Sequence, residues 1–170
     1  MLILLLAPVL LAQVERRALL GKIQTRQYFF KESNSNISYT LFVPSGYTKE
    51  KKTPMLVVLH GLFGNPWQMI GTDGLVQQAE KDGFIVVCPM GYNETGWYGS
   101  RGTGQMFPLG PKNHGALSEK DVMNVVGIVR REFNVDPKRM YLGGHSMGGA
   151  GTFYLAAKHP DLWAGLAPIA

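Results

Sequence analysis

The chain has 170 residues, of which 45% are hydrophobic and 17% are charged, with a formal net charge of +5. Its charged fraction lies below the roughly 25% of an average soluble domain, and its apolar content is too high for a disordered chain, so one globular domain is expected. Basic residues occur without the dense runs that follow a phosphate backbone, which argues against a nucleic-acid partner. The single cysteine, Cys88, excludes an intramolecular disulfide and a zinc site of paired cysteines, and we expect it in the core.

The N-terminal segment 1–12 carries no charged or polar side chain. A helix needs roughly 20 apolar residues to span a bilayer, so this segment is too short for stable membrane insertion. Its length is typical of the apolar region of a secretory signal peptide, and Ala12 offers a small-residue cleavage site before Gln13, although no basic residue precedes the apolar run. We therefore predict that residues 1–12 are a signal peptide and that the protein is secreted or periplasmic; the alternative is an ordinary apolar N-terminal segment.

Alternating and continuous apolar runs predict the strands of one sheet. Residues 26–30 and the alternating apolar positions from 37 to 43 predict two strands that pair in antiparallel fashion. Later runs are apolar throughout, which is typical of strands in a parallel sheet that helices cover on both faces. These runs are Met55–Leu59, Phe84–Cys88, the stretch that begins at Met140, and Leu166–Ala170.

Two stretches with helical spacing lie between the later strands. Ser118 with Asp121 three residues later resembles a capping box, and the apolar residues after it recur at helical spacing until Asn134 and Pro137 end the pattern. A second helix is expected over 150–158. Two strands followed by alternating strands and helices predict a three-layer α/β fold, with a mostly parallel sheet and antiparallel N-terminal strands.

A G-x-S-x-G motif at 144–148, with Ser146 at its centre, lies between a predicted strand and a predicted helix. In this context the motif makes a sharp turn that exposes the serine at the carboxyl end of the sheet, where α/β sheets bind their ligands. The helix that follows directs its N-terminal dipole and the backbone N–H of Met147 toward an anion that forms beside Ser146. We predict that Ser146 is a nucleophile; the alternative is a structural serine in a tight turn.

A second glycine-rich motif, His-Gly-Leu-Phe-Gly at 60–64, follows the apolar run that ends at Leu59. A loop of this composition can turn a backbone N–H, that of Leu62, toward the point that Met147 addresses, so that the two N–H groups form an oxyanion hole. We expect His60 to orient the loop rather than to act as a base. The alternative is an ordinary loop between a strand and a helix.

These motifs resemble those of a known superfamily. The chain resembles the N-terminal two-thirds of an α/β-hydrolase, and it is similar to secreted esterases related to polyhydroxyalkanoate depolymerases and feruloyl esterases, with a catalytic domain of the prolyl oligopeptidase type. The likeness runs from about Tyr39 to Ala170 and is carried by Val57–Gly61, Gly96–Gly99, Glu119–Val122, Met140–Gly149 and Asp161–Trp163.

The resemblance implies an α/β-hydrolase domain over residues 26–170. It implies hydrolysis of carboxylic esters through an acyl-enzyme, with no metal or organic cofactor. It also implies that Ser146 is the nucleophile and that Leu62 and Met147 are the donors of the oxyanion hole.

The chain departs from the family pattern in the rest of the catalytic triad, whose acid and histidine are expected on loops after later strands, in the order Ser, Asp or Glu, His. His159 and Asp161 follow Ser146, but a helix that rises about 1.5 Å per residue places them at its far end, about 20 Å away. We expect His145 to be a packed residue of the turn and His114 to be a solvated loop residue. We therefore expect the sequence to be incomplete at its C-terminus, with the acid and the histidine beyond residue 170, and to be inactive alone.

Three functions remain open at this point. The first is a serine esterase that acts on small-molecule or polymeric esters, such as extracellular ester-linked polymers or their fragments. The second is a serine peptidase of the prolyl oligopeptidase type, and the third is a non-catalytic binding module that keeps the turn. Trp97, Tyr98 and Phe107 either line an acyl pocket or pack beneath their loop. The sequence does not define the acyl group, the alcohol or the oligomeric state.

Overall fold

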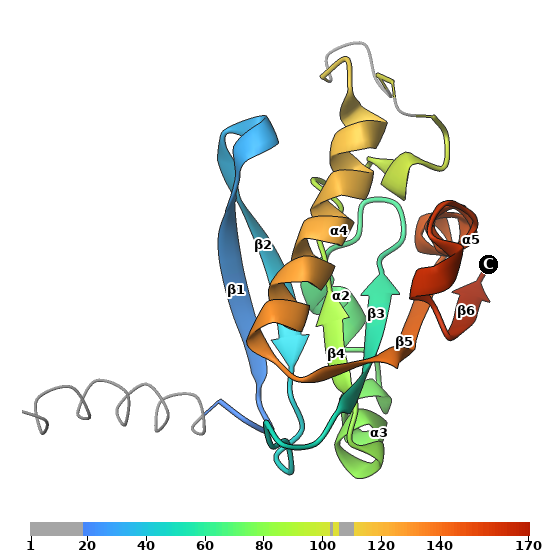
Figure 1. Cartoon of the computed structure of the whole chain (residues 1–170). Helices are drawn as coiled ribbons and strands as arrows, with labels where there is room; N and C mark the ends of the chain where they lie inside the picture. The colour runs from blue at the N-terminus through green and yellow to red at the C-terminus, as the bar shows by residue number, and fades with distance from the viewer. Residues whose placement is uncertain (1–18, 103, 106–110) are drawn as a thin grey trace, which may run out of the picture.

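The computed structural model describes residues 19–102, 104–105 and 111–170, and these residues form a six-stranded sheet with helices on both faces (Figure 1). The strand order is β1-β2-β4-β3-β5-β6. The predicted signal peptide at 1–12 lies outside the described residues. Within the described ranges, no helix is long and apolar enough to cross a membrane.

The first two strands form an antiparallel hairpin, as predicted. β1 (Ile23–Phe30) and β2 (Ser35–Phe42) pair along their whole length, from Ile23 opposite Phe42 to Phe30 opposite Ser35. The turn between them contains the short 3-10 helix η1 (Lys31–Ser33). β2 also pairs antiparallel with β4 (Ile85–Cys88), so the hairpin extends one edge of the sheet.

The remaining strands run parallel to one another. β3 (Thr53–Leu59) lies between β4 and β5 (Val135–His145), and β6 (Gly165–Ile169) pairs with β5 at the far edge. Each predicted apolar run is therefore a strand, and their carboxyl ends meet at one edge of the sheet. Pro137, expected to end a helix, lies inside β5 near a shift in the β3–β5 register; such a bulge accommodates a residue that cannot donate to the ladder.

Helices cover both faces of the sheet, which confirms the three-layer fold. α4 (His114–Glu132) and α5 (Met147–Lys158) pack on one face, and α2 (Pro66–Ile70) and α3 (Leu75–Asp82) pack on the other. We call these the α4/α5 face and the α2/α3 face. Cys88 is fully buried in the core of the α2/α3 face, as expected, and burial raises the pKa of its thiol to about 12.

The helix that was expected to start with a capping box begins earlier. Because α4 begins at His114, Ser118 and Asp121 lie inside the helix, and the capping-box prediction is wrong. Both side chains are fully buried. The Ser118 hydroxyl accepts a hydrogen bond from the Tyr98 N–H (3.0 Å), so it satisfies a neighbouring loop rather than its own helix N-terminus.

Asp121 ties α4 to two other segments. Its carboxylate accepts hydrogen bonds from the Tyr28 hydroxyl on β1 (2.5 Å) and from the Tyr92 N–H in the loop after β4 (3.0 Å). Burial raises the pKa of Asp121 above its ordinary value of 3.8, and these hydrogen bonds oppose the rise. The helix therefore holds a buried acceptor against both the hairpin and the loop.

His114 is another polar residue that the fold buries. The prediction of a solvated loop position is wrong, because His114 is the first residue of α4 and only 2% exposed. Its Nε2 lies 2.8 Å from Oδ1 of Asn93, and its ring meets the Tyr92 ring edge to face. These contacts join the start of α4 to the loop after β4.

Candidate active site

Ser146 occupies a sharp turn between β5 and α5, in the context that the motif predicts. Its backbone has φ 54° and ψ −113°, in the left-handed half of conformational space, and its side chain is exposed. Such a conformation costs a serine about 1–3 kcal/mol and persists where the surrounding structure determines it. Here the Ser146 N–H donates to the Ile169 carbonyl of β6 (2.7 Å), and the Ser146 carbonyl accepts from the Ala150 N–H (3.1 Å).

Close backbone packing around this turn explains its two flanking glycines. A Cβ at Gly148 would overlap the Leu59 carbonyl oxygen at the end of β3. A Cβ at Gly144 would lie 2.5 Å from the Gly148 carbonyl oxygen. Because no side chain fits at either position, the first turn of α5 can lie directly against the end of β3.

The loop after β3 lies against the same turn. A Cβ at Gly61 would lie 3.6 Å from Cβ of Ser146 and 3.3 Å from Nδ1 of His145. The Gly61 carbonyl accepts from the Gly64 N–H (2.9 Å) and lies 2.8 Å from Nδ1 of His60. Because N–H and C=O point in opposite directions across a trans peptide bond, the N–H of the next residue, Leu62, points away from both groups.

The two backbone donors predicted for an oxyanion hole are thus placed on adjoining segments. The Leu62 N–H has no hydrogen-bond acceptor among the residues that the structure describes. Met147 is the first residue of α5, and an N–H at that position has no partner within its own helix. Both N–H groups are available to a ligand, and that of Met147 lies at the positive end of the α5 dipole.

None of the four histidines makes a described hydrogen bond to Ser146. His60 is fully buried, with Nε2 2.7 Å from the Met90 carbonyl, which agrees with an orienting role in the loop. His159, past the end of α5, lies 3.5 Å from Glu119. His145 is exposed beside Gly61 rather than packed as expected. In the described part of the chain, no imidazole is hydrogen-bonded to Ser146.

The aromatic residues after β4 have different positions. Tyr98 is fully buried and packs beneath its loop, which decides between the two alternatives for this residue. Trp97 is partly buried, and the Arg101 guanidinium stacks 3.5 Å from the centre of its ring. Phe107 lies outside the described residues.

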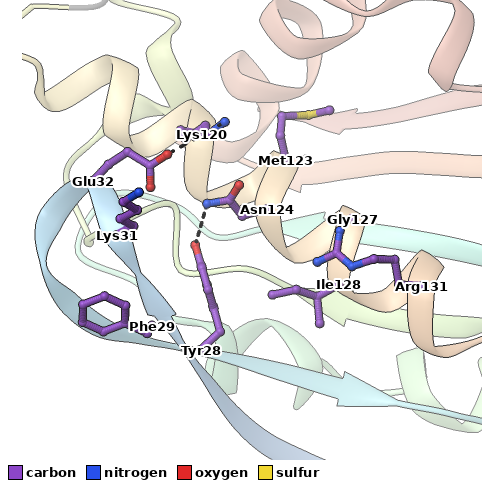
Figure 2. A pocket seen from close by; sticks show the side chains of 10 residues that line it. All are labelled: Tyr28, Phe29, Lys31, Glu32, Lys120, Met123, Asn124, Gly127, Ile128 and Arg131. Carbon is purple, nitrogen blue, oxygen red and sulfur yellow. Dashed lines mark hydrogen bonds and ion pairs between the residues drawn. The ribbon is translucent and has the colours of Figure 1, made fainter.

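A separate cleft of about 290 Å³ lies between β1 and α4 (Figure 2). Tyr28 and Asn124 meet in it at 3.5 Å, and three basic side chains, Lys31, Lys120 and Arg131, reach its rim. None of the residues predicted to take part in the reaction lines this cleft. It is therefore distinct from the turn at Ser146.

Comparison with known proteins gives one family. A model of a family described as putative esterase matches residues 31–170. Among curated relatives, feruloyl esterase B of Piromyces equi is 31% identical over 128 residues, 75% of this chain and 22% of that protein. Acetylxylan esterase A of Emericella nidulans is 26% identical over 79% of this chain and 42% of its own length. S-formylglutathione hydrolase of Bos taurus is 28% identical over 82% of this chain and 53% of its own length.

Solved structures share the fold. A thermostable esterase aligns with a TM-score of 0.62 and 25% identity over 89% of this chain and 41% of that structure. An S-formylglutathione hydrolase from Agrobacterium tumefaciens aligns with a TM-score of 0.69 and 18% identity over 85% of this chain and 56% of that structure. The chain spans between about a fifth and about half of the length of the curated relatives named above.

Proposed function

Because this chain belongs to the esterase family whose model covers residues 31–170, we propose that the protein hydrolyses carboxylic esters with Ser146 as its nucleophile. One observation carries the proposal. The exposed Ser146 is held at φ 54° between β5 and α5, with the Gly61 loop against its Cβ. A strained, exposed serine beside two available backbone donors is the arrangement that acyl transfer requires.

The reaction proceeds in two halves. Oγ of Ser146 attacks the ester carbonyl carbon while a general base takes its proton, and the oxyanion that forms accepts hydrogen bonds from the N–H groups of Leu62 and Met147. The alcohol leaves with that proton and an acyl-enzyme remains. Water, activated by the same base, then releases the acid and restores Ser146.

The general base must lie within hydrogen-bond distance of Oγ, and in the Ser-His-Asp arrangement it is an imidazole. No described histidine makes that contact, and no residue is assigned to the base or to its acidic partner. Their identity does not alter the roles proposed for Ser146, Leu62 and Met147.

The proposed substrates are extracellular ester-linked polymers or their small fragments. Support comes from two of the relatives, which are named as a feruloyl esterase and an acetylxylan esterase. The apolar segment 1–12 supports export, with cleavage before Gln13. N-terminal sequencing of the exported protein tests this part, and a mature chain that still begins at Met1 contradicts it.

The catalytic proposal is tested with Ser146→Ala in the full-length protein. We expect kcat for a nitrophenyl acetate to fall by a factor on the order of 10⁶, and labelling by a fluorophosphonate to disappear. Ser38→Ala on β2 is the matched control and leaves both unchanged. Hydrolysis of peptide anilides in preference to esters favours a peptidase, and ester turnover retained by Ser146→Ala contradicts the assignment of the nucleophile.

A further inference from the structure

Two consecutive aromatic residues after β4 share a positive φ with Ser146, although Tyr98 has ψ 21° where Ser146 has ψ −113°. Trp97 and Tyr98 both have φ 54°. A bulky side chain seldom adopts this conformation, and it persists where the surroundings leave no alternative. The surroundings of Tyr98 therefore indicate what this segment does.

Tyr98 is fully buried and hydrogen-bonded at both ends. Its N–H donates to the Ser118 hydroxyl of α4 (3.0 Å), and its own hydroxyl donates to the His60 carbonyl (3.0 Å). Burial raises the pKa of the Tyr98 phenol well above its usual value, so the hydroxyl remains a donor throughout the working pH range.

The ring of Tyr98 is fixed between two glycines. A Cβ at Gly151 of α5 would lie 2.5 Å from Cδ2 of the ring, and a Cβ at Gly91 would overlap Cε1. The ring therefore touches both the helix that follows Ser146 and the loop after β4. Neither neighbour can move toward the ring, because interiors are close-packed.

The hydroxyl end of Tyr98 reaches the other half of the site. The His60 carbonyl that accepts its hydrogen bond belongs to the residue before Gly61, which lies against Ser146. A Cβ at Gly148 would lie 2.9 Å from this same carbonyl oxygen. One side chain thus contacts the loop that carries Leu62 and the helix that carries Met147.

We propose that Tyr98 is a positioning residue for the oxyanion hole: it sets the separation between the N–H groups of Leu62 and Met147 through its hydroxyl on one side and its ring on the other. The assignment rests on the proposed function, because the two donors matter only if an oxyanion forms at Ser146. A displacement of one donor weakens its hydrogen bond to the transition state more than any contact to the ground-state ester.

The test is Tyr98→Phe, which removes the hydroxyl and keeps the ring. We expect kcat for a nitrophenyl acetate to fall about 10- to 100-fold while KM changes less than about threefold, since removal of a whole donor costs about 10²- to 10³-fold. Affinity for a trifluoromethyl ketone, which forms a tetrahedral adduct with Ser146, falls by the same factor as kcat/KM.

Tyr47→Phe is the matched control. The Tyr47 hydroxyl accepts a hydrogen bond from the Asn134 N–H (2.9 Å), away from Ser146, so its loss affects stability and leaves kcat unchanged. Ser118→Ala is a second variant, which removes the acceptor of the Tyr98 N–H without altering the tyrosine, and we expect a kcat reduced about threefold.

The outcomes separate the two proposals. Absence of ester turnover in the full-length parent protein contradicts the proposed function, and with it the role of Tyr98. Normal turnover in the parent with unchanged kcat in Tyr98→Phe, or a loss no greater than that of Tyr47→Phe, overturns the positioning role alone. A fall in kcat with an unchanged affinity for the trifluoromethyl ketone also overturns it.

Discussion

The two faces of the sheet differ in how many polar side chains they bury. The core of the α2/α3 face is built from apolar side chains such as Phe42, Val58 and Ile70, and its buried Thr40 donates to the Pro66 carbonyl. The α4/α5 side buries a larger set of polar residues that bond between segments, namely His60, His114, Ser118 and Asp121. Buried polar groups that are fully paired specify geometry as well as stability. The difference teaches that this protein places its most constrained geometry on the side that holds Ser146.

The largest effect is expected where a helix meets the turn itself. Gly148→Ala places a methyl group on the Leu59 carbonyl oxygen. We therefore expect the free energy of unfolding to fall by about 4 kcal/mol and ester turnover to be lost. Urea unfolding measures the first quantity. Gly46→Ala, where nothing lies within 4 Å of the added Cβ, is the control and leaves stability nearly unchanged. A stable, active Gly148→Ala protein contradicts the packing described at the turn.

A cavity in the opposite face separates stability from catalysis. Ile70 is fully buried on α2, and Ile70→Ala is expected to lower the free energy of unfolding by about 3 kcal/mol. The folded fraction keeps the kcat of the parent protein, because none of the residues of this core lies in the turn at Ser146. Trp67→Ala on the same helix, whose side chain is 52% exposed, changes stability by less than about 0.5 kcal/mol. A kcat reduced in Ile70→Ala breaks the contrast between the faces.

A smaller loss of stability on the α4/α5 face is expected to cost more activity. Asp121→Ala leaves the Tyr28 hydroxyl and the Tyr92 N–H without their acceptor, which costs about 2 kcal/mol. The loop after β4 loses its anchor, so kcat also falls, although Asp121 is not in contact with Ser146. Asp121→Asn keeps an acceptor oxygen and is expected to retain most of both quantities. Equal kcat values in Asp121→Ala and Ile70→Ala contradict the comparison.

The smallest effect concerns pH. Burial raises the pKa of Asp121 above 3.8, so the folded protein binds this proton more tightly than the unfolded chain does. The contribution of Asp121 to stability is therefore greatest below pH 3.8 and declines as pH rises through the higher folded-state pKa. The unfolding free energies of the parent and of Asp121→Asn are measured from pH 4 to pH 8. We expect the parent to lose stability relative to Asp121→Asn as the pH rises. A difference that does not change with pH is inconsistent with the raised pKa.

Local patterns in the sequence predict the fold well. The apolar runs mark the strands from β3 to β6, and the alternation at 37–43 marks β2. A strand buried on both faces is apolar throughout, and a strand buried on one face alternates apolar and polar residues. The strand, turn and helix around Ser146 follow from one motif and are confirmed in the structure. The chemical roles of Ser146, Leu62 and Met147 stay predictions.

The remaining features depend on partners that are distant in the sequence. Ser118 and Asp121 have the spacing of a capping box, yet their partners, Tyr98 and Tyr28, lie in other segments. The same holds for His114, whose burial depends on the fold of the loop that contains Asn93. Nothing in the sequence marks Tyr98 as a positioning residue, and the glycines on either side of the Trp97–Tyr98 pair, Gly96 and Gly99, are the signal that the backbone is unusual there.

The hydrogen bond from the Ser146 N–H to the Ile169 carbonyl makes the turn at Ser146 depend on the docking of β6. The amide proton of Ser146 exchanges with solvent only when β6 separates from the turn, so its exchange rate reports the docking of that strand. During synthesis β6 emerges after β5 and α5, so this hydrogen bond forms only once the last of the three segments has been made. The turn at Ser146 is therefore held by a strand that lies later in the chain than the turn itself.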